Sequence, residues 1–318
     1  MTLTQLEAFV LVARLGSVKA AAGVLGVSEP AVSSALAALR QHLGDQLVVR
    51  SPHGMELTAG GQRLVGIASQ MVNLGADAVA AIRRAQGAPD LLHVVATSTV
   101  AEFMAPPLLE LFTSRTASVE ATVGVSGTIE MPVLLLDRLA DVALGPRLSA
   151  AGIDSSPMMR HKLVVVAGKR HPLAGATDVT PEALSKSRWL VDPAGTEPSS
   201  EVGQLLQRFN VPERRTRVFS GASAVWSAVA EGHDVAPALA HLVARDVADG
   251  RLVVLPVRGT PVDVLWYVST LDLSRRSLAA TKLRQFLTTP DAMHVMHRAD
   301  GSVPVARFRP PVYVTLWS

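Results

Sequence analysis

The 318-residue sequence contains no cysteine. Disulfide bonds and thiolate metal sites are therefore excluded, as suits a protein of the reducing cytoplasm. The sequence also has no basic segment followed by a short apolar core at its start, and no run of about 18 apolar residues. We therefore expect a cytoplasmic protein that is neither secreted nor inserted into a membrane.

A strong excess of one charge is missing as well. Lys and Arg number 30 and Asp and Glu number 27, which gives a formal net charge of only +3. This balance does not by itself indicate nucleic acid, so any such surface must come from local placement of residues. The 48% of hydrophobic residues can fill sizeable cores, and the length allows two or three domains.

Motifs of common enzyme sites are absent. The sequence has no Gly-x-Gly-x-x-Gly loop and no P-loop, and GVSGT at 124–128 is not a nucleophile elbow. His233 beside Asp234 is expected to be solvated on a loop, and His294 and His297, three residues apart, are expected to be exposed. We therefore expect no catalytic residue, no metal and no cofactor.

The strongest pattern that is present lies in residues 17–50, which predict two short helices joined by a tight turn at Gly26. Ser17 and Ser28 stand where N-caps are needed, and Pro30 falls in the first turn of the second helix. Apolar residues recur at helical spacing in both helices: Val18, Ala21, Ala22 and Leu25, then Val32, Ala35, Leu36, Leu39 and Leu43. The pattern indicates a helix-turn-helix. An ordinary helical hairpin is the alternative.

The residues expected on the exposed side of the second helix are small or polar: Ser28, Glu29, Ser33 and Ser34. Such side chains allow close approach to phosphates and base edges. Residues 47–49 and 55–57 predict two short strands around a turn at 51–54, which together would form a wing. Arg50, at the edge of the wing, is expected to reach phosphate or the minor groove, or else to be a solvated strand-end arginine. An earlier helix points Leu3, Leu6, Phe9, Val10 and Ala13 toward the same core.

Taken in order, these residues resemble the N-terminal pattern of the LysR-type transcriptional regulators. The matching positions are Gln5, Leu6, Phe9, Gly16, Ser17, Ala20, Ala21, Ser28, Pro30, Ala31, Val32, Ser33, Leu43, Gly44, Leu57, Thr58 and Gly61. The resemblance implies a sequence-specific regulator that binds promoter DNA as a homodimer or homotetramer and contacts RNA polymerase. It implies DNA-binding roles for Gln5, Ser17, Ser28, Glu29, Pro30, Ser33, Ser34, Arg50 and His53.

Some positions depart from the family's pattern. Glu29 stands where the motif usually has glutamine, Ser34 lacks a long basic side chain, and Arg40 replaces a usual glutamate. A carboxylate accepts hydrogen bonds but does not donate them, so Glu29 changes which base edge it can pair with. Alternatively, Glu29 only stabilises the positive end of its helix. The operator sequence therefore cannot be borrowed from relatives.

Residues 58–88 predict one long linker helix that begins at Thr58 and ends near Gly87. Its apolar residues alternate in steps of three and four, which is typical of a two-helix seam: Leu64, Ile67, Met71, Leu74 and Ala78. The resemblance makes this helix the dimer-forming linker. Residues 1–57 before it form the mainly α winged helix-turn-helix domain.

Residues 90–289 alternate strand-like and helix-like segments, which predicts an α/β domain with mostly parallel sheets. The resemblance implies an effector domain with two lobes, like the periplasmic binding proteins. The first lobe would take residues 90–161 plus 270–289 and the second lobe 162–269. A small-molecule effector would bind in the cleft between them.

Hydroxyl side chains follow the predicted strands at this cleft. Ser98, Thr99 and Thr128 belong to the first lobe, and Thr196 and Ser220 to the second. The family uses hydroxyls at such positions to hold effector carboxylates; the alternative is plain helix capping. No basic residue is clearly aimed at the cleft, so the charge of the effector stays open.

Residues 290–318 extend the chain beyond the helix expected at 275–289. The end, RFRPPVYVTLWS, alternates like a strand, and we expect it to dock on the effector domain or on a partner subunit; the alternative is a poorly ordered terminus. Two other function classes remain to be weighed against the regulator. They are an α/β enzyme and a solute-binding protein, each with an appended helical domain.

Overall fold

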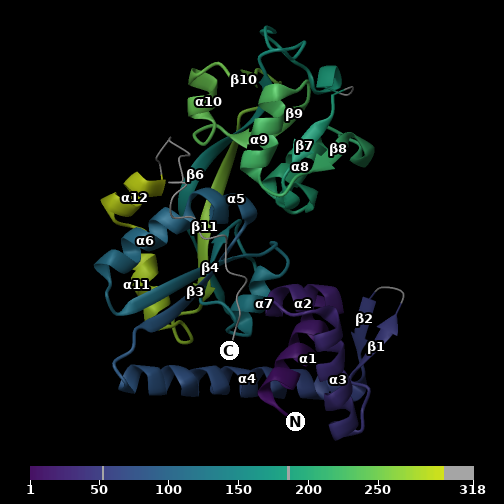
Figure 1. Cartoon of the computed structure of the whole chain (residues 1–318), viewed down its shortest axis with the longest axis vertical. Coiled ribbons are helices and arrows are strands. Elements are labelled where there is room, and N and C mark those ends of the chain that lie inside the picture. The colour runs from purple at the N-terminus through teal and green to yellow at the C-terminus, as the bar shows by residue number, and fades with distance from the viewer. Residues whose placement is uncertain (52–53, 185–186, 297–318) are drawn as a thin grey trace.

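The computed structural model describes residues 1–51, 54–184 and 187–296. The molecule is elongated, with a helical head and a long helix at one end and an α/β domain above them (Figure 1). His53, His297 and the expected C-terminal strand lie outside the described residues.

The head contains the predicted pair of helices. Its helices are α1 (Leu3–Leu15), α2 (Val18–Leu25) and α3 (Glu29–Leu43). The Ser17 and Ser28 hydroxyls accept from the backbone N–H groups at the starts of α2 and α3, as expected of N-caps. Gly26 ends α2 with a left-handed backbone (φ +65°), which turns the chain so that α2 and α3 are bent by 107°. These features confirm the helix-turn-helix.

The core of the head consists mostly of the predicted apolar residues, among them Leu6, Phe9, Val32, Leu36 and Leu39, all nearly inaccessible to solvent. Two positions differ from the prediction. Leu43, in the last turn of α3, is 40% exposed. Leu3 is 47% exposed and lies beside Gly75 of the long helix rather than in the core.

The wing is a two-stranded antiparallel ribbon of β1 (Val48–Ser51) and β2 (Gly54–Leu57). Arg50 pairs with Met55 across the ribbon, and its side chain is exposed. The wing extends beside α3 at the edge of the head (Figure 1). Both α3 and the ribbon therefore carry exposed side chains at this edge of the head.

The linker helix α4 (Ala59–Ala85) packs along α1. Its predicted seam divides into two groups. Leu64 and Met71 are partly buried against the head, whereas Ile67 and Leu74 are 56% and 67% exposed. Within the described chain α4 alone has a straight stretch, Ala59–Arg83, with the length and mean hydropathy (1.3) to cross a membrane. The length and mean hydropathy of a helix do not by themselves place it in a membrane.

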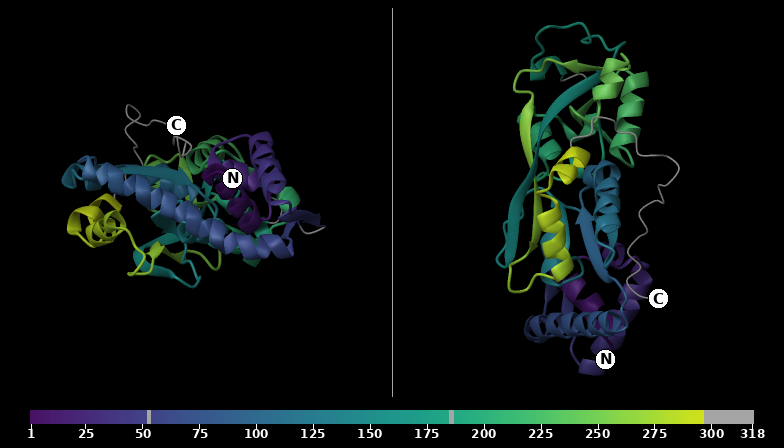
Figure 2. Two further views of the ribbon diagram at one scale, coloured as in Figure 1. Left: turned by 90° about the horizontal axis from the view of Figure 1, so that it is seen from below. Right: turned by 90° about the vertical axis from the view of Figure 1, so that its left-hand side faces the viewer.

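The α/β domain is built on a sheet with the strand order β4-β3-β5-β11-β6-β9-β7-β8, with β10 paired to β6. The strands are β3 (Asp90–Ala96), β4 (Val119–Val125), β5 (Val142–Gly145), β6 (Ile153–Gly168), β7 (Trp189–Val191), β8 (Thr216–Val218), β9 (Val235–Leu239), β10 (Leu252–Leu255) and β11 (Val262–Leu271). We call the half with β3, β4 and β5 lobe 1 and the half with β7, β8, β9 and β10 lobe 2. The long strands β6 and β11 run through both lobes (Figure 2).

The expectation of mostly parallel strands is wrong for this sheet, which is mixed. Strands β3, β4 and β5 pair in parallel within lobe 1, as do β7, β8 and β9 in lobe 2. Every described pairing of β6 and β11 is antiparallel. These two strands carry the chain between the lobes in opposite directions, which requires antiparallel pairing with each other.

Helices cover both lobes. Lobe 1 carries α5 (Ser98–Phe103), α6 (Ala105–Arg115), α7 (Met131–Leu136), α11 (Leu278–Phe286) and α12 (Pro290–Met296). Lobe 2 carries η1 (Pro181–Leu184), η2 (Pro193–Thr196), α8 (Glu201–Arg208), η3 (Glu213–Arg215), α9 (Ala222–Glu231) and α10 (Ala244–Ala248). The start of the C-terminal extension, α12, lies on α6, where Asp291 accepts from Arg115 at 2.5 Å.

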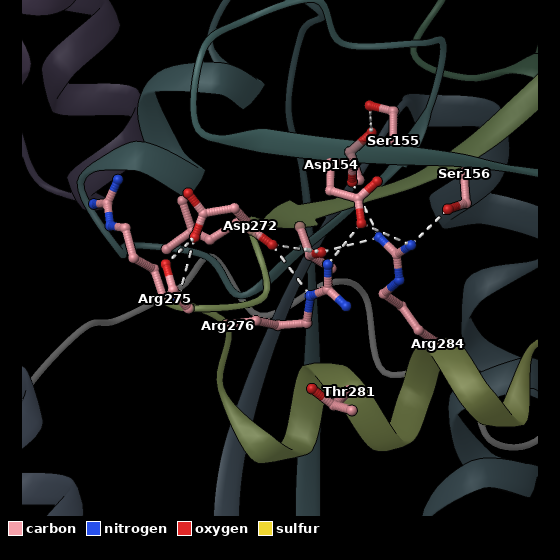
Figure 3. Close-up of polar contacts among 12 residues, drawn as sticks. Asp154, Ser155, Ser156, Asp272, Arg275, Arg276, Thr281 and Arg284 are labelled. Carbon is pink, nitrogen blue, oxygen red and sulfur yellow. Dashed lines mark hydrogen bonds and ion pairs between the residues drawn. The ribbon is translucent and has the colours of Figure 1, made fainter.

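A polar network fixes α11 to the long strands (Figure 3). Arg276 Nη2 and Arg284 Nη2 lie 2.7 and 3.1 Å from Asp154 Oδ2 on β6. Arg284 also donates to Ser156 Oγ at 2.5 Å. Both guanidinium groups are largely buried, so these contacts hold the returning segment of the chain in lobe 1.

Candidate DNA-binding surface and interlobe cleft

The first two turns of α3 present an exposed, small and polar surface. Ser28, Glu29, Pro30, Ser33 and Ser34 are all exposed. The buried side chains Val32, Leu36 and Leu39 take the opposite face and hold α3 against α1 and α2. The helix is thus fixed by one face while the other is open to a ligand as large as duplex DNA.

Three of the predicted DNA-binding residues also have local structural roles. Ser28 Oγ accepts from the Ala31 N–H at 3.4 Å, and Ser17 Oγ accepts from the Ala20 N–H at 3.3 Å. Gln5 forms a capping box with Thr2 at the start of α1. The structure therefore places Gln5 and Ser17 at the N-termini of α1 and α2, and Ser28 at the start of α3.

Arg40 makes a structural contact that the sequence did not reveal. Its Nε donates to the Gln46 carbonyl and its Nη2 to the Val48 carbonyl, both at 2.7 Å. These bonds join the last turn of α3 to the first strand of the wing. Arg40 therefore sets the wing relative to the recognition helix, and no periodicity in the sequence could have indicated a contact to backbone carbonyls.

Asp45 organises the junction between the wing and the linker helix. Its Oδ1 accepts from the Leu47 N–H at 2.6 Å and from the Thr58 hydroxyl at 2.8 Å. The bond from the Leu47 N–H, followed by that from Thr58, lowers the pKa of Asp45. The ionised carboxylate thus links the loop before β1 to the cap of α4, because the Thr58 hydroxyl also accepts from the Gly61 N–H.

The interlobe cleft brings two of the predicted effector residues together with an acid. Ser98 Oγ and Thr99 Oγ1 of lobe 1 donate to Asp192 Oδ2 of lobe 2, at 2.5 and 3.2 Å. Asp192 is buried and directly follows β7, and its other oxygen accepts from the Gly195 N–H. A carboxylate of the chain itself therefore lies on the hydroxyls that were expected to hold an effector.

Two further carboxylates cross the cleft in the same manner. Glu197 Oε2 accepts from the Thr128 N–H at 2.9 Å. Glu102 of α5 accepts from the Ala222 N–H at 3.0 Å, and from the N–H and hydroxyl of Ser223, at the start of α9. Sequence reasoning missed all three acids, although Asp192 stands at the carboxyl end of a predicted strand, where ligand-facing side chains gather.

The other predicted effector residues lie in different surroundings. The Thr128 hydroxyl is buried, whereas the Thr196 hydroxyl donates to the Pro193 carbonyl within its own turn. Ser220 is exposed after β8. Of the five predicted positions, the structure thus brings Ser98 and Thr99 into one polar group.

A small cavity of about 60 Å³ lies between the lobes. Thr99 reaches it from lobe 1, and lobe 2 contributes Asp192, Glu201, Trp226 and other residues. Burial raises the pKa of Glu201, and the negative charges of Asp192 and Glu197 raise it further, against the lowering effects of a backbone hydrogen bond and a hydrogen bond to Trp266. The cavity is therefore a place where negative charge is poorly compensated.

A second junction connects the head to lobe 1. Asp137, only 3% exposed at the end of α7, accepts from the Ser69 hydroxyl of α4, and its Oδ2 lies 3.8 Å from Arg14 Nε of α1. Burial raises the pKa of Asp137, against the lowering effects of the Ser69 bond and Arg14. A cavity of about 670 Å³ adjoins this contact and is lined by α1, α4 and lobe 1 residues, Glu7 among them.

A winged helix-turn-helix head, a long helix and a two-lobed α/β domain define a DNA-binding regulator with a separate binding domain. Two family models match the chain. "Bacterial regulatory helix-turn-helix protein, lysR family" matches residues 3–62, and "LysR substrate binding domain" matches residues 85–290.

Relatives agree over the full length. The HTH-type transcriptional regulator Rv0377 of Mycobacterium tuberculosis is 35% identical over 323 residues, covering 100% of both chains. The regulator CfxR of Cupriavidus necator is 26% identical and covers 96% of this chain and 97% of its own. The chain belongs to the LysR family of transcriptional regulators.

Solved structures share the fold. The LysR regulator CbnR has a TM-score of 0.54 at 21% identity and covers 90% of this chain and 98% of its own. Full-length BenM has a TM-score of 0.53 at 18% identity, with 92% and 98% covered. The family consists of transcriptional regulators, so the chain is not an enzyme, and the enzyme alternative falls.

Proposed function

We propose that the chain binds promoter DNA as a homo-oligomer, a dimer or a tetramer, and that a small-molecule effector bound between its lobes alters this binding. The observation that carries the proposal is the exposed polar start of α3 beside the exposed Arg50 of the wing. A helix fixed on its buried face and small on its outer face can enter a major groove, while the wing reaches the adjacent backbone.

The attraction of the head to DNA has to come from where its individual charged and polar groups lie, not from its net charge. Residues 1–57 hold four Lys or Arg and four Asp or Glu, so the head has no formal excess of positive charge. Side chains such as Arg50, together with N–H groups at the starts of helices, would make the phosphate contacts. Binding is then expected to depend less steeply on salt than binding by a strongly basic head.

Oligomerisation is supported by the surface of α4. Ile67, Leu74 and Ile82 are 56%, 67% and 60% exposed and recur at helical spacing on one side of the helix. A second α4 would cover this stripe by coiled-coil packing and would place two heads on one duplex. In this proposal residues 1–57 are the DNA-binding head, residues 58–88 are the dimer-forming linker and residues 90–289 are the effector domain.

The link between effector and DNA is proposed to run through the second junction. Asp137 connects lobe 1 to α4 and α1, so a movement of lobe 1 changes contacts that involve Ser69 and Arg14. An effector acts in this way only if it prefers one arrangement of the lobes energetically. The protein would work in the cytoplasm and contact RNA polymerase at its promoter.

A footprint of the full-length chain on the DNA upstream of its own gene tests this proposal. The expected result is two protected half-sites whose centres are separated by whole helical turns, each about 10 base pairs. A single protected half-site would contradict the paired heads, and no protection at moderate salt would contradict the DNA-binding role.

A further inference from the structure

The interlobe cavity carries negative charge without nearby positive charge. Asp192 and Glu201 line it, and Glu197 is close enough to act on Glu201 electrostatically. Among the described residues that line the cavity, none is Lys, Arg or His. Between described residues, these three carboxylates form no ion pair. The described lining of the cavity therefore has no cationic side chain that could pair with an anion.

Several hydrogen-bond donors around the cleft are also already used, although the buried Thr128 hydroxyl has no hydrogen-bond partner among the described residues. The hydroxyls of Ser98 and Thr99 donate to Asp192, and the Thr128 N–H donates to Glu197. At the start of α9, the donors bond Glu102. To reach the occupied donors, a carboxylate effector would have to displace carboxylates that are covalently part of the chain, and it would then add its charge to theirs.

Two glycines make room for these internal carboxylates. A Cβ at Gly127 would meet Glu130 Oε2 and would lie 2.6 Å from Glu197 Oε1, and a Cβ at Gly221 would lie 2.9 Å from Glu102 Oε2. Both distances are too short for real contacts. The backbone on both sides of the cleft thus approaches these carboxylates closely.

A cation would complete this cavity. Glu201 has a hydrogen bond to Trp266 but no cationic partner among the described residues, and a bound ammonium group would stabilise its ionised carboxylate. Trp226 and Trp266 also line the cavity, and aromatic rings attract cations. The volume of about 60 Å³ accommodates a small head group rather than a whole metabolite.

We propose that the interlobe cleft selects a cationic effector, one whose ammonium group lies beside Asp192 and Glu201 in the cavity that Trp226 and Trp266 also line, and that it rejects carboxylates. This assignment rests on the proposed function, in which the effector binds between the lobes. It goes further by fixing the charge of the group that enters the cavity.

The test compares matched probes on the full-length protein. Butylammonium chloride, sodium butyrate and butan-1-ol have the same carbon chain and differ in charge, and sodium chloride controls for ionic strength. The thermal unfolding midpoint and the tryptophan fluorescence report binding, since Trp226 and Trp266 line the cavity. We expect butylammonium to raise the midpoint and change the fluorescence, and butyrate and butanol to do neither.

Two variants locate the effect. Glu201→Gln removes the charge inside the cavity, and Glu213→Gln removes an exposed charge on η3. Glu201→Gln is expected to weaken the response to butylammonium by about tenfold or more, whereas Glu213→Gln leaves it unchanged. Without ligand, Glu201→Gln should unfold at a higher temperature than the parent near neutral pH, because the costly buried charge is gone. A cooperative unfolding transition of the variant also shows that it folds.

The outcomes separate this inference from the proposed function. A larger response to butyrate than to butylammonium overturns the cationic assignment but leaves an effector cleft. The assignment also fails if neither ion has an effect, or if Glu201→Gln responds like the parent. DNA binding of the same ligand-free preparations is measured independently, and only its failure overturns the regulator itself.

Discussion

Gly61 lies at the contact between α4 and the wing, and its replacement by alanine is the sharpest test of how the head is built. A Cβ there would overlap the Leu47 carbonyl oxygen and lie 2.9 Å from the carbonyl carbon. That oxygen accepts from the Thr58 N–H at 3.0 Å. Because the obstacle is backbone, the clash cannot be relieved by rotating a side chain.

Gly66, one and a half turns further along α4, is the matched control. A Cβ there meets nothing within 4 Å. Alanine at this position should stabilise the helix by about 0.5–1 kcal/mol, since it is the better helix former. Alanine at Gly61 gains the same propensity but is overpacked, which costs typically ~1–3 kcal/mol and leaves a net loss.

Urea unfolding of the full-length protein at one protein concentration measures both effects. We expect Gly61→Ala to lower the unfolding midpoint of the head and Gly66→Ala to raise it. DNA affinity should fall for Gly61→Ala alone, because the shift displaces the wing. Two shifts of the same sign would refute the packing described for this junction.

Three further predictions concern single side chains. Arg40→Ala should destabilise the head by ~2–3 kcal/mol in urea unfolding and weaken DNA binding by about tenfold. Arg40→Lys should not restore binding, because an ammonium group cannot replace the guanidinium fork that bonds two carbonyl groups. Full binding by the lysine variant would contradict this. Burial raises the pKa of Glu7 above its ordinary value of 4.5, so its stabilising contribution is present below that value and is lost as the pH rises through the raised pKa. Glu7→Gln should therefore raise the melting temperature near pH 7 and leave it unchanged near pH 4, and an equal effect at both would count against the burial argument. Leu74→Glu should shift the protein toward monomer in sedimentation experiments, since it puts charge in the exposed stripe of α4; an unchanged mass would remove this stripe from the interface.

The head could be predicted almost completely from its sequence. Its caps, its turn glycine and its apolar spacing are local signals, and they agree with one another at Ser17, Gly26 and Ser28. The contacts that were not predicted join residues of different elements, or bond a side chain to backbone carbonyl groups. Arg40 bonds carbonyl groups of the wing, and neither its charge nor its position in α3 announces such a partner.

The α/β domain was predicted in class but not in detail. Strands β3, β4 and β5 lie in segments that the sequence predicts to be strand-like, whereas β9 was not predicted as a strand, since VAPAL contains a proline and small residues. The hydroxyls of Ser98 and Thr99 were found because they follow a strand. Their partner Asp192 lies 93 and 94 residues away, and no local pattern connects such positions.

The central claim is that the exposed start of α3 reads DNA. Fluorescence anisotropy of labelled DNA from upstream of the chain's own gene tests it with two variants of exposed helical serines, Ser33→Glu on α3 and Ser114→Glu on α6. The account predicts that the parent and Ser114→Glu bind this DNA with equal affinity, while Ser33→Glu loses binding because a carboxylate then faces the phosphates and base edges. Equal binding by all three proteins, or binding by none, would contradict it.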